Sequence, residues 1–337
     1  MRRGILFMGV ALLLLLLLFA LDLALGSVRL PVADVLEALW GSSPSNVLAS
    51  SIVSGYRLPK AITAVLAGGA LSVSGLLMQT VFRNPLAGPY VLGISSGASL
   101  GVAVVVLGSS ALGLGYWAGQ LGVVVAAMMG AMLVLLLILA VSLRVRDIMT
   151  ILILGMMFGS AASAITSILQ FFSDESALKS YVLWTMGSVS GVSGTRLLLF
   201  AGIVGAGLLL AQLLARPLNV LSLGEGYAKT LGYNVMAVRF MVFVATSLLA
   251  GSAAAFCGPI GFIGLAVPHV VKMLLRTSSH ALLLPATLVA GADVLLLCDL
   301  LAQLPGSDLV FPLNSVAALM GIPIVIYVVF RNKRIAS

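Results

Sequence analysis

The chain has 337 residues, of which 61% are hydrophobic and only 8% are charged. Soluble domains carry about 25% charged residues, and a water-soluble fold of this length needs far more polar surface. The composition excludes a cytosolic enzyme, a nucleic-acid-binding module and a disordered scaffold, and it predicts an integral membrane protein. The net charge of +8 comes from basic residues scattered between hydrophobic runs, a pattern that orients helices in a bilayer.

The first apolar run extends from Ile5 to Leu21 and follows a pair of arginines, Arg2 and Arg3. A cleavable signal peptide and a first membrane helix are both compatible with this pattern. The run is longer than a signal core, and no clear Ala-x-Ala cleavage site follows it. A retained helix with its arginine pair in the cytoplasm is therefore favoured.

Apolar stretches predict nine further spans, because about 20 apolar residues cross the bilayer, and all but the one that contains Asp293 and Asp299 are uncharged. Gly-rich breaks near 108–115 divide residues 84–143 into two spans, and Cys257-Gly258-Pro259 divides residues 240–271. The remaining spans are expected at residues 61–82, 148–173, 197–215, 282–301 and 312–330. The sequence thus predicts an all-α integral membrane protein with about ten transmembrane helices in a single domain, residues 1–337.

The distribution of basic residues predicts the orientation. An even number of helices places both termini on one side of the membrane. With that side in the cytoplasm, five of the 18 Lys and Arg residues fall outside and the others inside, which fits the positive-inside rule. The five outer residues are Arg29, Arg57, Lys60, Lys179 and Arg196.

A weak internal similarity links residues 66–75 with residues 249–258, and Pro85 with Pro268, at a constant offset of 183 residues. The two copies fall in the second and seventh predicted helices, which must run in opposite directions. Inverted repeats of this kind are typical of transporter folds.

Two groups of glycines have small-xxx-small spacing. Such positions let helix backbones approach closely in lipid, so packing between helices of one subunit is the first interpretation. A face that lines a subunit interface or a transport pathway is the alternative. The residues are Gly93, Gly97 and Gly101 in one group and Gly155 and Gly159 in the other.

The longest polar segment on the predicted inner side covers residues 216–233. Ser222 or Gly224 can cap a short helix there, and Gly232 can end it in a left-handed conformation. A solvated loop and a pair of short helices that dock into a groove are both compatible with this segment. Two helix faces are expected, one with Tyr227, Ala228 and Leu231 and the other with Glu225 and Lys229.

A series of motifs follows in a fixed order from about residue 55 to the end of the chain. They are Arg57-Leu58-Pro59-Lys60, residues 75–89, residues 92–98, Leu223-Gly224-Glu225, Leu231-Gly232, residues 258–265, Pro268-His269 and Gly321-Ile322-Pro323. Together they resemble the FecCD family of permeases, the membrane subunits of ABC importers for vitamin B12, haem and ferric siderophores.

The resemblance implies a type II ABC importer permease that works as a homodimer, with the transport pathway at the dimer interface. It also implies two ATPase subunits on the cytoplasmic side and a periplasmic binding protein outside. Residues 217–232 would form the cytoplasmic coupling helices. The residues implied at the ATPase contact are Leu223, Glu225, Ala228, Leu231 and Gly232.

Two further sites follow from the same resemblance. Arg57 and Lys60 match basic positions that meet acidic residues on the binding protein, and such exposed pairs steer the partner. A further basic docking position is Gln303 here, which departs from the vitamin B12-like pattern. The turn with Ile148, Met149 and Thr150 falls near the family's cytoplasmic gate.

The sequence carries no P-loop, since no Gly-x-x-x-x-Gly-Lys-Ser/Thr motif occurs in it. ATP and Mg would therefore bind to a partner ATPase, and no catalytic residue or cofactor is predicted for this chain. Cys257 and Cys298 lack disulfide or metal-site spacing. His269, expected at the inner end of the eighth helix, has no carboxylate or thiol neighbour in sequence, so no metal site is predicted. His280 is expected in a cytoplasmic loop without an evident role.

Asp293 and Asp299 fall within the ninth predicted helix, where ionisable residues are costly and usually functional. They motivate the alternative of a proton-coupled secondary transporter. Six residues separate them by about 240° around the helix, so they should face different directions, with Asp299 near the outer end within reach of water. An intramembrane enzyme is a third alternative, but no paired catalytic motif supports it.

The sequence therefore predicts the homodimeric permease of an ABC importer in the bacterial inner membrane, with both termini in the cytoplasm. The expected cargo is an iron chelate, either a ferric siderophore or haem, and cobalamin is the alternative. The expected partners are a second copy of the chain, two ATPases, a periplasmic binding protein and the lipid bilayer, without nucleic acid.

Overall fold

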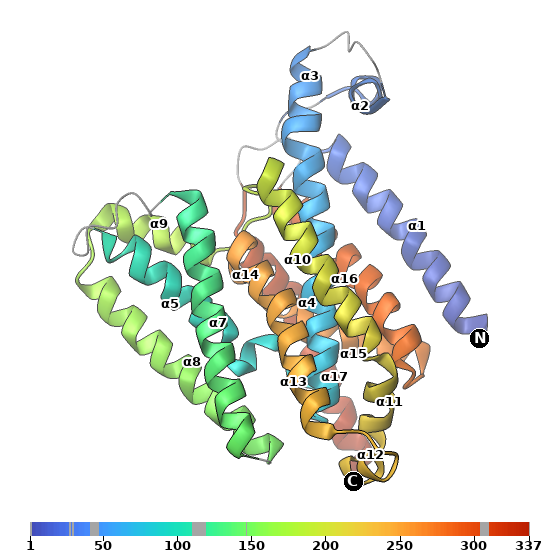
Figure 1. Cartoon of the computed structure of the whole chain (residues 1–337). Coiled ribbons are helices and arrows are strands. Elements are labelled where there is room, and N and C mark those ends of the chain that lie inside the picture. The colour runs from blue at the N-terminus through green and yellow to red at the C-terminus, as the bar shows by residue number, and fades with distance from the viewer. Residues whose placement is uncertain are drawn as a thin grey trace.

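The computed structural model describes residues 2–26, 28, 30–40, 47–109, 119–145, 147–303 and 310–336. Within these ranges the chain is built from helices, and its β-structure is one isolated bridge between Gln303 and Val310. The helices stand roughly side by side in a bundle, and α2 and α3 project from its upper end (Figure 1).

The elements follow one another in this order: α1 (Arg2–Ala24), α2 (Val32–Trp40), α3 (Val47–Ile52), η1 (Val53–Arg57), α4 (Leu58–Val81), η2 (Pro89–Leu92), α5 (Ile94–Val106), α7 (Gln120–Arg144), α8 (Ile148–Phe171), α9 (Glu175–Thr185), α10 (Gly194–Leu213), α11 (Ala215–Leu223), α12 (Glu225–Thr230), α13 (Val235–Thr246), η4 (Ser247–Gly251), α14 (Ser252–Cys257), α15 (Ile263–Leu275), α16 (His280–Ala302) and α17 (Leu313–Ala336).

Seven helical segments of the described chain are long and apolar enough to cross a membrane. Three shorter apolar helices, at Ile94–Val106, Ile263–Leu275 and Leu313–Tyr327, join them. These helices correspond to the ten predicted spans. The predicted break after Cys257 is present, because Gly258 adopts a positive φ of 75° where α14 ends. Most of the predicted break at 108–115 lies outside the described residues.

Helix α4 forms the centre of the bundle, and nearly all of its residues are buried. It packs against α16 and α15 with almost no side chain between the backbones. A Cβ atom at Gly68 would lie 2.2 Å from the carbonyl oxygen of Gly291, and one at Gly75 would lie 1.6 Å from that of Gly264. Small residues are what permits this approach in a membrane protein, where helices associate through close packing.

A second set of close contacts joins α5, α7 and α8. A Cβ atom at Gly101 would lie 2.0 Å from the carbonyl oxygen of Ala126, and one at Gly97 would lie 2.5 Å from that of Gly130. Gly93 ends η2 with a positive φ of 74°. It lies against Gly155 and Gly159 of α8. Both glycine groups therefore pack helices of the same chain together.

The second and seventh spans run in opposite directions. Helix α4 descends from α3, whereas α13, η4 and α14 ascend from the lower end (Figure 1). The two similar segments thus lie in the expected helices, but the match at an offset of 183 does not hold at its last positions. Gly75 lies inside α4 while Gly258 follows α14, and Pro85 lies in a turn while Pro268 lies inside α15. The second and seventh spans are therefore antiparallel, but these matched glycines and prolines do not occupy equivalent places in them.

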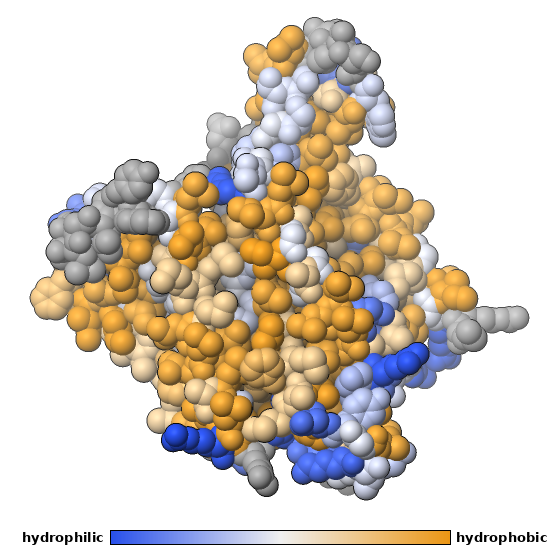
Figure 2. All heavy atoms as spheres, viewed as in Figure 1, coloured by the Kyte–Doolittle hydropathy of each residue, from blue (hydrophilic) through white to orange (hydrophobic). Residues whose placement is uncertain are grey.

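The outer surface is that of a membrane protein. Figure 2 shows apolar residues across the middle of the visible face and hydrophilic residues gathered at the lower end, where α11 and α12 lie. Large apolar side chains such as Leu16 of α1 and Leu136 of α7 are exposed. Exposed apolar area of this extent is stable only in contact with lipid or other proteins.

The α4 contacts predict the effect of a single methyl group. Gly75→Ala should lower the stability of the purified protein by about 1–3 kcal/mol, because α4 and α15 must separate to admit the Cβ atom. Gly205→Ala in α10 is the matched control, since no atom lies within 4 Å of its Cβ position. A thermal-shift assay in detergent should show a lower midpoint for Gly75→Ala alone. Equal midpoints for both variants would contradict the packing described.

Candidate functional site

The predicted cytoplasmic segment forms two short helices, α11 (Ala215–Leu223) and α12 (Glu225–Thr230), at the lower end of the bundle (Figure 1). Gly224 separates them with a φ of 137°, and Gly232 follows α12 with a φ of 80°. These positive φ values favour glycine. The prediction of two short helices, with Gly232 in a left-handed conformation after the second, is confirmed.

The exposed side of this helix pair carries apolar side chains among polar ones such as Lys229 and Thr230. The side chains of Leu223 and Leu231 are 70% and 52% exposed, and Tyr227 is similarly exposed. Ala228 was expected to share their face, but it is only 2% exposed and packs inward. A buried methyl group cannot meet another protein, so the assignment of Ala228 to a partner contact is wrong. The Ala228 side chain instead packs α12 against the rest of the bundle.

Two arginines tie the helix pair to the membrane helices. Arg239 of α13 donates a hydrogen bond and forms an ion pair with Glu225, the first residue of α12. Arg83, in the turn that follows α4, donates to the carbonyl oxygen of Leu221 in α11 over 2.9 Å. Glu225 therefore has a partner within its own chain. It holds α12 against α13.

A third link runs through His280, which was expected in a loop without a role. That expectation is wrong, because His280 is the buried first residue of α16. Its Nε2 lies 2.8 Å from the hydroxyl of Thr80 in α4, and its Nδ1 lies 2.8 Å from Oδ1 of Asn219 in α11. The backbone N–H of His280 also donates to Asn219 over 2.7 Å. One imidazole thus joins α4, α11 and α16.

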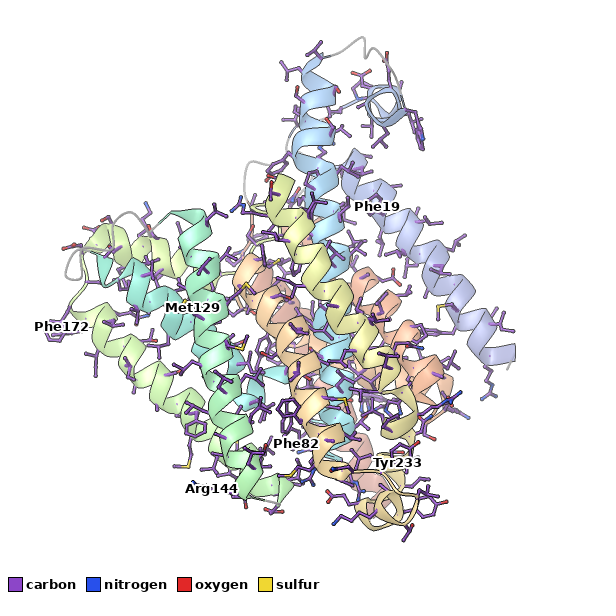
Figure 3. All side chains as sticks on the ribbon, viewed as in Figure 1. Phe19, Phe82, Met129, Arg144, Phe172 and Tyr233 are labelled. Atoms are coloured by element: carbon purple, nitrogen blue, oxygen red, sulfur yellow. The ribbon has the colours of Figure 1, made fainter. Side chains whose placement is uncertain are left out.

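A cleft of about 330 Å³ lies between the α12–α13 corner and the adjacent ends of α7 and α8. Glu225, Lys229 and Arg239 line one side, and Ser142 and Ile151 line the other. Arg144 and Tyr233 lie at this same lower end (Figure 3). The structure therefore places the helix pair next to the start of α8, where a gate was predicted.

The predicted gate residues form the first turn of α8. Asp147 caps this helix by accepting hydrogen bonds from the backbone N–H of Thr150 over 2.8 Å and from its hydroxyl over 2.6 Å. These two bonds lower the pKa of Asp147. Ile148 is partly exposed, and Met149 is exposed. The cap fixes where α8 begins.

Arg57 and Lys60 are not surface residues. Lys60 is 1% exposed and forms ion pairs with Asp22 of α1, over 2.8 Å, and with Asp299 of α16, over 2.7 Å. Arg57 is 4% exposed. It donates to the carbonyl oxygens of Leu23 over 2.8 Å and of Ala24 over 2.9 Å, and its second nitrogen donates to Val28. The prediction that both cations dock a partner protein is therefore wrong, because neither can reach one.

The two carboxylates of α16 have different surroundings. They face different directions, as predicted, since Asp299 points to Lys60 while Asp293 lines a groove with α1, α15 and α17. The expectation that water reaches Asp299 is wrong, because its side chain is buried in the ion pair. The cluster of Asp22, Lys60 and Asp299 holds α1 to α4 and α16. The role of the cluster is to stabilise the packing of these three helices.

The described residues contain no group of three or more His, Cys, Asp or Glu side chains that could hold a metal ion. His269 lies in the middle of α15, not at its inner end. Cys257 and Cys298 are buried free thiols.

The ion cluster can be tested by removing its cation. Lys60→Met leaves two buried carboxylates without a counter-charge, a change that costs about 3–5 kcal/mol. Lys179→Met, at an exposed lysine of α9, is the matched control. The thermal midpoint in detergent should fall strongly for Lys60→Met only, and adding Asp22→Asn and Asp299→Asn should recover part of it. A stable Lys60→Met single variant would contradict the cluster.

Comparisons with known proteins agree with this architecture. Residues 13–331 match the FecCD transport family. The vitamin B12 import system permease protein BtuC of Klebsiella pneumoniae subsp. pneumoniae is 37% identical over 278 residues, which cover 82% of this chain and 82% of that protein. The hemin transport system permease protein HmuU of Yersinia pestis is 33% identical over 322 residues, which cover 94% of this chain and 95% of that protein.

A solved structure shares the whole arrangement. It is provisionally assigned as a metal-chelate type ABC transporter in an inward-facing conformation. The two chains are 28% identical and superpose with a TM-score of 0.84, over 96% of this chain and 98% of the other. The chain belongs to the FecCD transport family and is a multi-pass permease of the ABC importer type.

Proposed function

We propose that two copies of this chain form the membrane pathway of an importer that carries a metal chelate from the periplasm to the cytoplasm. In this proposal the chain lies in the bacterial inner membrane with both termini in the cytoplasm. A separate ATPase binds and hydrolyses the ATP, and a periplasmic binding protein delivers the cargo. The observation that supports the proposal is that Leu223, Tyr227 and Leu231 are exposed on a helix pair whose other side is tied to the membrane helices.

The links behind this face can transmit movement. An ATPase that binds Leu223 and Leu231 would move α11 and α12 together, because both helices are short and only Gly224 separates them. Arg83 and His280 then pull on the ends of α4 and α16, and the Glu225–Arg239 pair pulls on α13. Rigid-body rocking of packed helices is an established way of opening and closing a pathway.

The gate in this proposal is the first turn of α8, with Ile148, Met149 and Thr150. The cleft between this turn and α12 gives the helix pair room to move towards α8 or away from it. Gly93 packs directly on Gly155 and Gly159 of α8. The backbones of α8 and the start of α5 are in direct contact there, so a movement of α8 would move α5 as well.

The proposed cargo is an iron chelate, either haem or a ferric siderophore. A hemin permease aligns with 94% of this chain, and a solved relative is provisionally assigned to metal chelates. Gln303 replaces a basic residue expected for vitamin B12-like docking. Cobalamin is the second candidate, because a vitamin B12 permease is 37% identical to this chain.

The coupling assignment predicts that apolar contacts on α11 and α12 hold the ATPase. Leu223→Asp and Leu231→Asp should each weaken ATPase binding at least about tenfold, which corresponds to about 1.4 kcal/mol. Leu48→Asp in α3 places the same charge on an exposed leucine at the opposite end and should leave binding unchanged. Co-purification and binding by surface plasmon resonance measure the effect. Unchanged affinity in both coupling variants, with intact folding, would refute the assignment.

Reconstitution tests the energy source and the cargo. Proteoliposomes with the permease alone should take up no haem, ferric siderophore or cobalamin. Addition of the cognate ATPase, the binding protein and ATP should start uptake of one of them, measured with radiolabelled cargo. Uptake driven by a proton gradient without the ATPase would overturn the ABC assignment in favour of a secondary transporter. Uptake of cobalamin alone would replace the iron-chelate assignment.

A further inference from the structure

Arg239 lines the cleft that separates the α12–α13 corner from the lower ends of α7 and α8. The cleft has a volume of about 330 Å³, and Val145 and Ile151 line its opposite side. These two residues flank Asp147, which caps α8, in the sequence. A cation that is only 9% exposed therefore lies across the cleft from the start of α8.

The guanidinium of Arg239 can bind more than one carboxylate. Its ion pair with Glu225 uses one nitrogen, Nη2. An arginine side chain carries five N–H donors in a planar fork, so the pair with Glu225 leaves it the capacity for a second carboxylate. Charge-assisted hydrogen bonds of this kind are about twice as strong as those between neutral groups.

The carboxylate of Asp147 offers an acceptor for such a bond. Thr150 donates to Asp147 from its backbone N–H over 2.8 Å and from its hydroxyl over 2.6 Å, and both bonds end on Oδ2. The other oxygen, Oδ1, takes part in neither bond, and the side chain is exposed. The pKa of Asp147 is lowered mainly by the bonds from Thr150 and more weakly by the charge of Arg239. The two groups therefore already act on each other.

Closure of the cleft would bring the carboxylates of Glu225 and Asp147 towards each other. The repulsion between two like charges grows as water is expelled from the space between them, and a cation placed between the carboxylates removes it. Lys229 also lines the cleft, but its side chain is exposed, and an ammonium group is a strongly hydrated point charge without a fork. Arg239 is the cation whose burial and geometry suit this position.

We propose that Arg239 joins the two sides of the cleft when it closes, by keeping Glu225 and also binding Oδ1 of Asp147. The proposal rests on the roles of α12 in coupling and of α8 in gating that are proposed above. The Arg239–Asp147 pair is made in the closed arrangement and broken in the open one. Thr150 stays bonded to Oδ2 in both, so the first turn of α8 remains helical and moves as a unit.

Cross-linking of the full-length permease in nanodiscs tests the Arg239–Asp147 pair. Leu143→Cys and Thr230→Cys place exposed thiols beside the cleft on α7 and α12, and the two native cysteines are buried. A short bismaleimide joins the thiols when the cleft closes, and mass spectrometry of the monomer band measures the rate of the intrachain product. Asp147→Asn should lower this rate at least fivefold. Its thermal midpoint should stay unchanged, because asparagine caps a helix as well as aspartate does.

Two further variants identify the partner of Asp147. In an Arg239→Gln background, Asp147→Asn should have no further effect on the cross-linking rate. Lys229→Gln is the matched control, since it removes a cation from the same cleft and should leave the rate unchanged.

The proposal is overturned if the protein without these charge substitutions gives no intrachain product, or if Asp147→Asn cross-links at the same rate. An equal loss by Asp147→Asn in both backgrounds would show that Arg239 is not its partner, and an equally large loss in Lys229→Gln would assign the contact to the lysine instead. No ATPase or cargo is present, so these outcomes concern the Arg239–Asp147 pair alone, whereas uptake into proteoliposomes tests the proposed function.

Discussion

The contact of helix backbones with α4 is the constraint on which the rest of the structure depends. Carbonyl oxygens of Gly264 and Gly291 lie where a side chain would otherwise stand on Gly75 and Gly68. In lipid, such close packing replaces the hydrophobic effect as the source of helix association. It turns α4, α15 and α16 into one body, so that forces applied at their ends are carried along the whole bundle rather than absorbed by side-chain rearrangement.

This body carries polar groups mainly at its two ends. At one end, Lys60 binds carboxylates of α1 and α16. At the other, Thr80, His280 and Asn219 join α4 and α16 to α11. The two ends have different tasks: the first fastens the peripheral helix α1, and the second fastens the short helices that carry the proposed ATPase contact. The middle between them is mostly apolar, which suits the interior of a bilayer, although Ser72, Thr287 and Asp293 are buried there.

The ten helices could be predicted because span length and lack of charge are local properties of the sequence. Contacts between side chains that lie far apart in the sequence could not be predicted from it. Nothing near Lys60 in the sequence points to Asp299, and a lone lysine at a helix end normally lies at the surface. The inward face of Ala228 was missed because α12 has six residues, too few for a reliable periodicity. His280 was missed since its partners come from two distant helices. The available signals of the cluster were two carboxylates in apolar surroundings, Asp22 beside the first apolar run and Asp299 within the ninth predicted helix.

The cluster of Asp22, Lys60 and Asp299 also bears on how the protein is made. Asp22 and Lys60 enter the membrane early and can neutralise each other as soon as α1 and α4 are inserted. Asp299 follows 239 residues after Lys60, in the ninth of the ten membrane helices. The cluster is therefore completed only near the end of synthesis, and until α16 arrives the first turn of α4 exposes a lysine that only one carboxylate shields. Late insertion of α16 thus locks the earliest helices in place.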